Sequence, residues 1–235
     1  MLFAAAIVLL VCCKKDDPGV NCNNGGNENS GGGQSQTLTL QPDASTGKDA
    51  TIWYIESQST SKGPTNTSNY GYDAEFPAME WTFDGSYGTK QGLVQFDLSG
   101  IPSNSTIVNA QLSLYNCDSC GDPGHALINV SNPNGTNQGL VQRVTSSWDE
   151  NAVTWNTRPS FTTQNQVILP ASTSASEDYT NINVTALVQD MLTNSSTSYG
   201  FLVSMQDTTI YRRLIFASSD HINPAKHPKL VVQYK

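Results

Sequence analysis

The sequence has few charged side chains, and basic ones are the scarcest. Charged residues make up 14% of its 235 positions, and 12 Lys and Arg residues stand against 20 Asp and Glu residues, so the formal net charge at pH 7 is −8. Binding to nucleic acid irrespective of sequence depends on a concentration of basic side chains. The composition therefore argues against a nucleic-acid partner.

Long hydrophobic runs are also missing. The longest apolar stretch, residues 2–11, is too short to span a bilayer as a helix but has the length of the apolar region of a signal peptide. It leads directly into Cys12 and Cys13, and two lysines and two aspartates follow. This arrangement resembles the signal of a Bacteroidota-type lipoprotein, in which a cysteine is lipidated after cleavage. The alternative is a buried N-terminal strand.

The lipoprotein resemblance implies a signal peptide over residues 1–13 and a lipid on Cys13. It also implies an outer-membrane protein that is exposed at the cell surface and contacts the membrane through its lipid anchor only. Residues 14–36 contain almost no apolar side chain, so they bury too little surface to offset the entropy of ordering them. We expect a disordered tether there and one folded domain over residues 37–235.

Within this domain, short runs of alternating apolar residues are frequent. Val94, Phe96 and Leu98 would share one face of a strand, as would Leu112 and Leu114. Gly- and Pro-rich turn signals separate such runs. Regularly spaced strands with polar loops predict an all-β domain, an antiparallel β-sandwich of the jelly-roll type.

One segment departs from this alternation. Residues 184–192 place apolar side chains at the i, i+3, i+4, i+7 and i+8 positions of a helix. The spacing predicts one short helix near 184–193, with Asn183 or Thr185 as its N-cap. We expect the helix to close one end of the sandwich, with its apolar stripe in the core.

Four segments, at residues 92–116, 142–160, 181–203 and 212–234, resemble in this order the motifs of the DNRLRE-domain family, also classed as carbohydrate-binding module family 96. The resemblance covers nearly all of the folded part. It implies a non-catalytic β-sandwich, and members studied as binding modules recognise polysaccharides, alginate among them. The chain departs from the family pattern in an acidic segment at residues 73–87 and in Asn183, where an aspartate is common.

The sequence lacks the common catalytic motifs: it has no Gly-x-Ser-x-Gly, no His-Glu-x-x-His, no phosphate-binding glycine loop and no EF-hand. Asp149 and Glu150, between Trp148 and Trp155, resemble the carboxylate pair of a glycoside hydrolase in composition. Neighbouring side chains on a strand point to opposite faces, so we expect the acids to cap a turn or orient Arg158 and the tryptophans to pack in the core. The domain is predicted not to be an enzyme.

Cysteine and histidine are too scarce for a complete metal-binding motif. Cys117 and Cys120 lack the second cysteine pair of a structural zinc site, and we expect a local disulfide between them in an extracellular compartment. The alternatives are a metal site with His125 as a third ligand and a thioredoxin-type redox site. His125, His221 and His227 lie in turns rich in Gly, Pro and Asn and are expected to be isolated surface residues.

Oxygen ligands, in contrast, are abundant, and Ca²⁺ prefers carboxylate and carbonyl oxygens. Asp49 at the start of a strand, Asn69 and Asp220 are the candidate ligands of a structural calcium ion. The alternative is that these side chains bond to loop backbone groups.

Sugar binding requires flat aromatic faces beside polar side chains. An aromatic segment at residues 68–88, expected to be a loop, and a basic patch at residues 211–227 offer both. The candidate ligand-binding residues are Tyr72, Trp81, Phe83, Tyr211, Arg212, Arg213 and Lys226. Arginine would pair with the carboxylate of a uronate sugar. The alternative is that some of these aromatic side chains cover the end of the sandwich and that Arg213 points inward as a structural residue.

Together, these features predict a non-catalytic cell-surface lipoprotein that binds polysaccharide, polymers containing uronate among the candidates. The alternative is a structural or adhesive surface protein whose sandwich mediates protein–protein contact or self-association. Aromatic side chains that lie coplanar and exposed along a groove would favour the first.

Overall fold

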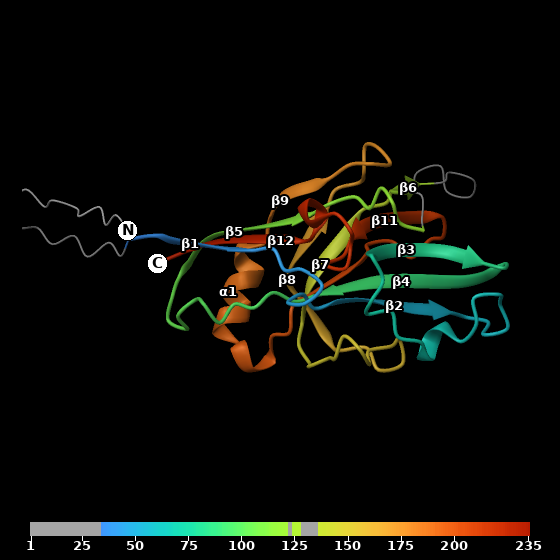
Figure 1. Ribbon diagram of the computed structural model, residues 1–235, viewed down its shortest axis with the longest axis horizontal. Helices are drawn as coiled ribbons and strands as arrows, with labels where there is room; N and C mark the ends of the chain where they lie inside the picture. Colours follow the sequence, from blue (N-terminus) through green and yellow to red (C-terminus); the bar gives the residue numbers. More distant parts are fainter. Residues whose placement is uncertain (1–33, 122–123, 128–135) are drawn as a thin grey trace, which may run out of the picture. The chain divides into compact units, whose positions relative to one another are not determined.

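A computed structural model describes residues 34–121, 124–127 and 136–235 of the chain. Residues 34–235 form one compact unit, built from two antiparallel β-sheets and one α-helix (Figure 1). The all-β sandwich predicted from the sequence is therefore confirmed. The predicted signal peptide, Cys13 and the tether up to residue 33 lie outside the described residues. Within the described part, no helix is long and apolar enough to cross a membrane.

The smaller sheet contains four strands. Their order is β1 (Gln36–Leu40), β12 (Lys229–Tyr234), β5 (Ile107–Leu114) and β9 (Tyr179–Asn183). Leu230 of β12 pairs with Leu40 on one side and with Leu112 on the other. Paired residues share a face of the sheet, so the alternating leucines of this sheet point together into the interior.

The larger sheet contains eight strands. Seven follow one another in the order β6 (Ala126–Leu127), β11 (Arg212–Ala217), β3 (Glu75–Phe83), β4 (Ser86–Val94), β10 (Phe201–Met205), β7 (Gly139–Val144) and β8 (Phe161–Leu169), and β2 (Asp49–Ile55) pairs with β4. All of these pairings are antiparallel.

Strand β4 is the branch point of the larger sheet. Lys90 pairs with both Trp53 of β2 and Met79 of β3. Val94 pairs with both Asp49 of β2 and Phe201 of β10. A strand has two hydrogen-bonding edges, so β3 and β10 share the edge opposite β2. The sheet therefore splits along β4 into one branch with β3 and β11 and another with β10, β7 and β8.

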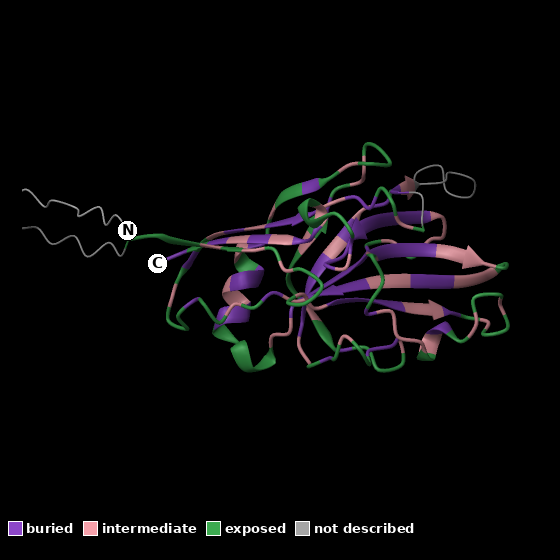
Figure 2. Cartoon of the chain, viewed as in Figure 1, coloured by how far each residue is buried: buried purple, intermediate pink, exposed green. Residues whose placement is uncertain are grey.

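The main core draws buried side chains from both branches, from the smaller sheet and from the helix, and Figure 2 shows the buried segments along the strands. Phe76 of β3 crosses over Gly92 of β4, where a Cβ atom would lie 2.5 Å from Phe76 Cδ2. Position 92 therefore requires glycine, because any side chain would push the Phe76 ring out of the core.

The predicted helix is confirmed as α1 (Thr185–Thr193). The N-cap position is occupied by Val184, not by Asn183 or Thr185 as predicted. Asn183 Oδ1 nevertheless accepts a hydrogen bond from the Thr185 backbone N–H at 3.0 Å and so satisfies one free donor of the first turn. The apolar stripe of α1 is buried in the main core. Three short 3₁₀ helices lie in loops: η1 (Thr65–Thr67), η2 (Ser195–Thr197) and η3 (Pro224–Lys226).

A second apolar cluster includes the loop between β7 and β8. Trp148 of this loop is buried, packs with Leu93 and donates its Nε1–H to the Tyr199 carbonyl at 2.9 Å. Trp155 is partly buried and packs against the same cluster. The core role predicted for the two tryptophans is therefore confirmed for Trp148, and Trp155 lies at the edge of the cluster.

Asp149 and Glu150 bond to different groups. Glu150 Oε1 accepts the Asp49 N–H at 2.8 Å. Asp149 caps a turn, as predicted, by accepting the Asn151 N–H at 2.8 Å. Arg158 is oriented by Trp155: it donates to the Trp155 carbonyl at 2.9 Å, and its guanidinium carbon lies 4.4 Å from the ring centroid.

The segment at residues 68–88, expected to be a loop, is largely strand. It contains the hairpin of β3 and β4, which turns at Asp84 and Gly85 with φ angles of 49° and 81°. Two positive φ angles are typical of the turn that an Asp-Gly pair favours between antiparallel strands. Phe76 and Ala78 of this segment are buried in the main core, so only part of its aromatic content is free to meet a ligand.

Candidate functional site

Strand register gathers aromatic and basic side chains on one face of β11, β3, β4 and β2. Arg213 pairs with Met79, Met79 with Lys90, and Lys90 with Trp53. Antiparallel partners share a face, so these four residues form one row across four strands. We call the following set, built around this row, the aromatic face: Trp53, Tyr70, Trp81, Phe83, Lys90, Tyr211 and Arg213.

The rings of the aromatic face support one another. Trp81 meets Tyr211 edge-on with the ring centroids 5.3 Å apart. Trp53 lies 5.0 Å from Phe83 and 5.5 Å from Tyr70, measured between centroids. These separations are typical of favourable aromatic pairs. All five rings are partly exposed, so they are fixed in place and still reach solvent.

Each of the two cations lies over a ring. The Arg213 guanidinium carbon is 4.9 Å from the Trp81 centroid, and Lys90 Nζ is 4.6 Å from the Trp53 centroid. Arg213 also donates its Nε–H to the Gly124 carbonyl at 2.9 Å, and Lys90 Nζ lies 3.6 Å from Glu75. Cation–π attraction thus holds both charges beside the aromatic surface.

The Phe83 ring packs directly over the backbone of Gly88, where there is no room for a side chain. A Cβ atom at Gly88 would lie 2.7 Å from Phe83 Cδ2 and 2.7 Å from the Tyr54 carbonyl oxygen. Gly88 is therefore a positioning residue for the aromatic face.

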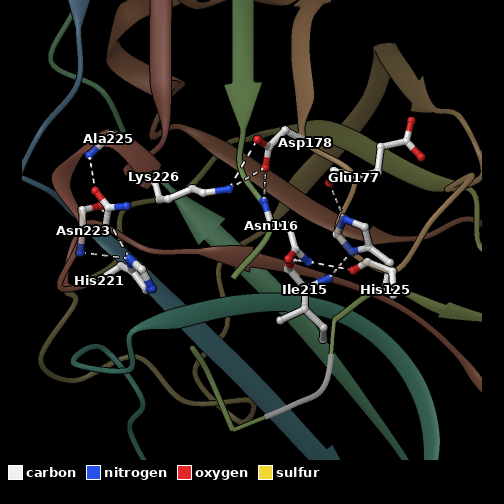
Figure 3. A network of polar contacts seen from close by, with 10 residues as sticks. Asn116, His125, Glu177, Asp178, Ile215, His221, Asn223, Ala225 and Lys226 are labelled. Carbon is white, nitrogen blue, oxygen red and sulfur yellow. Dashed lines mark hydrogen bonds and ion pairs between the residues drawn. The ribbon is translucent and has the colours of Figure 1, made fainter. Parts of the chain in front are cut away.

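Four of the predicted ligand-binding residues, from two separate stretches of sequence, meet on this face: Trp81, Phe83, Tyr211 and Arg213. Tyr72 is 72% exposed and makes no ring contact within the described chain. Lys226 pairs instead with Asp178, at 3.0 Å (Figure 3). None of its contacts among the described residues is with the aromatic face.

Arg212 corrects the sequence prediction. It is 1% exposed, its Nη1 lies 2.6 Å from Asp207 Oδ2, and it donates to the Thr136 carbonyl at 2.8 Å. A ligand at the surface does not reach this side chain. Because neighbours on a strand point to opposite faces, only Arg213 of the arginine pair belongs to the aromatic face, and Arg212 is a structural cation.

Glu80 pairs in register with Arg212 and is buried beside it. Tyr87 donates its hydroxyl to Glu80 Oε2 at 2.5 Å, and Thr89 donates to Oε1 at 2.9 Å. Burial raises the pKa of Glu80 from 4.5 to about 7, although both hydroxyls and Arg212 favour the charged form. The carboxyl group therefore exchanges its proton near neutral pH.

Three carboxylates gather at the other end of β2. Asp49, Glu150 and Asp220 each offer an oxygen, and these oxygens lie within 4.8 Å of one another. Asp49 Oδ2 accepts the Ser219 N–H at 2.9 Å, and Glu150 Oε1 accepts the Asp49 N–H at 2.8 Å. Burial raises the pKa of Asp49 to about 6, and the neighbouring acids add to the shift. Such an oxygen set has the chemistry that Ca²⁺ requires.

The calcium ligands expected from the sequence are thus only partly brought together. Asp49 and Asp220 meet, and Glu150, which was not predicted as a ligand, joins them. Asn69 holds the Glu150 loop from outside: its Nδ2 donates to the carbonyls of Glu150 and Val153 at 2.7 and 2.8 Å, and its Oδ1 accepts the Gly71 N–H. Asn69 is a positioning residue for this carboxylate cluster.

The expectation that the three histidines are isolated surface residues is wrong. His125, His221 and His227 are all at least 96% buried. His125 Nδ1 accepts the Ile215 N–H, and its Nε2 donates to the Glu177 carbonyl (Figure 3). Their turns fold back onto the sandwich, where the rings satisfy backbone groups that lack partners of their own.

Cys117 and Cys120 form the predicted disulfide. Between them, Ser119 Oγ lies 2.8 Å from His221 Nε2, an arrangement that resembles a nucleophile–base pair. His221 Nδ1, however, accepts the Asn223 N–H at 3.1 Å. In the neutral ring the proton is therefore on Nε2 and is donated to Ser119, which is the wrong tautomer for a base that activates Ser119.

A cavity of about 600 Å³ opens between the loop after β4 and the end of α1. Leu98, Ile101, Met191 and Leu192 supply apolar walls, and Lys48 and Asp97 lie among the polar lining residues. None of its lining residues belongs to the aromatic face. The one aromatic residue among its lining residues, Phe96, is only 7% exposed, so the cavity offers little ring surface for stacking and the aromatic face is the better candidate for a sugar.

Sequence reasoning missed three members of the aromatic face: Trp53, Lys90 and, as a site residue, Tyr70. Trp53 lies in a run of strand-forming residues, and the local sequence does not indicate that its side chain belongs to a site. Its place beside Lys90 follows from the pairing of β2 with β4. No local signal reveals that pairing.

The sequence profile of carbohydrate-binding module family 96 matches residues 54–234. The match begins inside β2, so β1 and most of β2 belong to the same compact unit but precede the matched range. No curated protein gives a significant match.

The raised pKa of Glu80 predicts how the free energy of unfolding depends on pH. Its folded-state pKa is raised, so the folded protein binds this proton more tightly than the unfolded chain does. The free energy of unfolding therefore falls as the pH rises from 4.5 to about 7. Thermal unfolding at a series of pH values should show the melting temperature rising by several degrees on acidification through this window.

The variant Glu80→Gln should flatten that pH dependence, and Asp49 should supply the part that remains. Glu56→Gln, at an exposed carboxyl, is the matched control and should leave the dependence unchanged. A melting temperature that rises with pH across the window would contradict this account of Glu80.

Proposed function

The chain belongs to carbohydrate-binding module family 96, and from this premise we propose that its aromatic face binds polysaccharide at the cell surface. Membership of a family of carbohydrate-binding modules indicates a binding domain rather than a catalyst. The observation that carries the proposal is the meeting of five partly exposed rings and two cations on neighbouring strands.

The chemistry of the face suits a sugar polymer. Pyranose rings present C–H groups that stack on aromatic side chains, and polar groups beside the rings bond to hydroxyls. Arg213 uses its Nε–H for the Gly124 carbonyl, and its other two guanidinium nitrogens make no hydrogen bond within the described chain. Arg213 is only 9% exposed, so a uronate carboxylate would have to reach these nitrogens at the edge of the Trp81 ring. On this condition, uronate-containing polymers are the proposed class of ligand.

Affinity electrophoresis of the full chain in gels containing alginate, polygalacturonate or neutral xylan tests this proposal. We expect retardation that Trp81→Ala weakens by roughly tenfold or more, because central aromatic contacts dominate such interfaces. Arg213→Gln should weaken binding to the two uronate polymers more than binding to xylan.

Trp155→Ala is the matched control, because Trp155 carries a stacked arginine as Trp81 does but lies on another part of the domain. It should leave retardation unchanged. If none of the polymers binds, or if Trp155→Ala and Trp81→Ala lose binding equally, the proposal fails. The adhesive alternative, with contacts between protein domains, would then be the better account.

We also propose that the carboxylate cluster of Asp49, Glu150 and Asp220 holds a structural Ca²⁺. Three carboxylates this close repel one another, and a divalent cation would offset that repulsion. Added Ca²⁺ should raise the melting temperature at pH 7 by several degrees relative to a sample in chelator. Asp220→Asn should abolish the increase, whereas Asp97→Asn, at an exposed carboxyl elsewhere, should preserve it. An equal melting temperature with Ca²⁺ and with chelator would contradict the proposed calcium site.

For localisation, we propose an outer-membrane lipoprotein anchored through Cys13. The support is the sequence pattern: a short apolar run, the cysteine pair and a polar tether. In bacteria that produce the full chain, the protein should incorporate a labelled fatty acid and partition with membranes. Cys13→Ala should lose both properties, and Cys22→Ala should keep them. Labelling that survives Cys13→Ala would refute this anchor site.

A further inference from the structure

The disulfide loop has a third potential metal ligand beside it. Cys117 and Cys120 follow β5, and His221 lies in the segment after β11. Each offers one ligand atom, and the two sulfurs and the imidazole nitrogen all lie within 4.8 Å of one another. The fold thus brings an imidazole from about a hundred residues away onto a Cys-x-x-Cys pair.

We propose that the reduced form of this loop binds one Zn²⁺ through Cys117, Cys120 and His221. The disulfide and the metal site are two alternative states of the same three residues. This inference goes beyond glycan binding and does not depend on it.

Reduction should leave the fold intact. The disulfide encloses only two residues, and the stabilisation from a disulfide depends on the length of the chain that it closes. Cys117 remains packed with Met79 and Ile215 in an apolar cluster that does not need the S–S bond. Cys120 is partly exposed, so a small reductant can reach the bond.

The reaction balances with a water-soluble phosphine as reductant. The S–S bond breaks, the two sulfurs gain two electrons and two protons, and the phosphine takes the oxygen of one water molecule to become its oxide. Zn²⁺ then displaces the two thiol protons. Two thiolates neutralise the charge of the ion, which suits a site where Cys117 and His221 are buried.

A fourth ligand position is available. The Ala74 carbonyl oxygen lies 3.4 Å from Cys120 Sγ and 3.8 Å from Cys117 Sγ. This oxygen or a water molecule can complete the four-coordinate geometry that Zn²⁺ prefers.

His221 points the correct nitrogen at the loop. Its Nε2 contacts Ser119 Oγ at 2.8 Å. Its Nδ1 contacts Asn223 (Figure 3). Metal at Nε2 requires the ring proton to move to Nδ1, where the Asn223 carbonyl oxygen at 3.5 Å can accept it. The Asn223 N–H, which bonds to Nδ1 in the oxidised form, then loses that acceptor. Ser119 therefore competes with the metal for Nε2.

The test uses the full chain with Cys12→Ser, Cys13→Ser and Cys22→Ser, so that only the loop cysteines remain. The protein is reduced with the phosphine and titrated with Co²⁺, and then with Zn²⁺. We expect a sulfur-to-cobalt charge-transfer band that saturates at one equivalent and disappears when Zn²⁺ displaces Co²⁺. The oxidised protein should show no band.

Variants separate this site from adventitious thiol binding. Cys120→Ser should abolish the band, and His221→Ala should weaken Co²⁺ binding at least about tenfold. Ser119→Ala, the matched control within the loop, should bind as tightly or more tightly, because the competitor for Nε2 is gone.

Three outcomes would overturn the proposal. They are the absence of a band in the reduced protein, Co²⁺ binding by His221→Ala as tight as that of the parent, and circular dichroism that shows the domain unfolded by reduction. The last outcome counts against the site because His221 approaches the cysteines only in the folded chain.

Discussion

The structure depends on one constraint, the pairing of β4 along both of its edges. β2 occupies one edge, and the other is divided between β3 and β10. Where β3 leaves β4, Phe76 crosses over Gly92 and closes the main core. Farther along β3, the same three-strand pairing puts Trp81 on the same face as Trp53 and brings the Phe83 ring against the Trp53 ring. The aromatic face is thus a consequence of where the sheet divides, and it rests on the same hydrogen bonds that hold the sandwich together.

The division of the sheet also explains where charge is buried. Glu80 and Arg212 pair in register on the β3–β11 branch, and Asp49 pairs with Val94 where β10 takes over the edge of β4. Buried ionisable groups need partners. Arg212 has Asp207, and Glu80 has two hydroxyls. Asp49 has backbone donors and two other acids, an arrangement that favours a bound proton or a bound cation. The carboxyl groups of Glu80 and Asp49, whose pKa values burial raises, thus both lie on strands that pair with β4.

The sequence predicts the parts of this structure that local patterns determine. Alternation predicts the β-sandwich, and the spacing of apolar residues from Val184 to Leu192 predicts the helix. Residue type alone singles out Trp81 and Arg213. Arg212 alternates with Leu214 and Phe216, which indicates that it shares their buried face. However, every residue of β11 is buried, so the sequence of this strand does not distinguish its two faces. Trp53, Lys90 and the burial of the histidines depend on pairings between distant segments, which no local pattern encodes.

The net charge of −8 does not by itself oppose an anionic ligand. Exposed charges more than about 8 Å apart are largely screened at physiological ionic strength, so the groups at the contact decide. On the aromatic face, Lys90 already lies 3.6 Å from Glu75, and within the described chain Arg213 has no carboxylate partner. Any uronate would therefore meet one largely buried guanidinium at the edge of the Trp81 ring rather than a basic groove. In the proposed function, stacking would therefore supply most of the affinity, and the arginine would select among sugars that stack equally well.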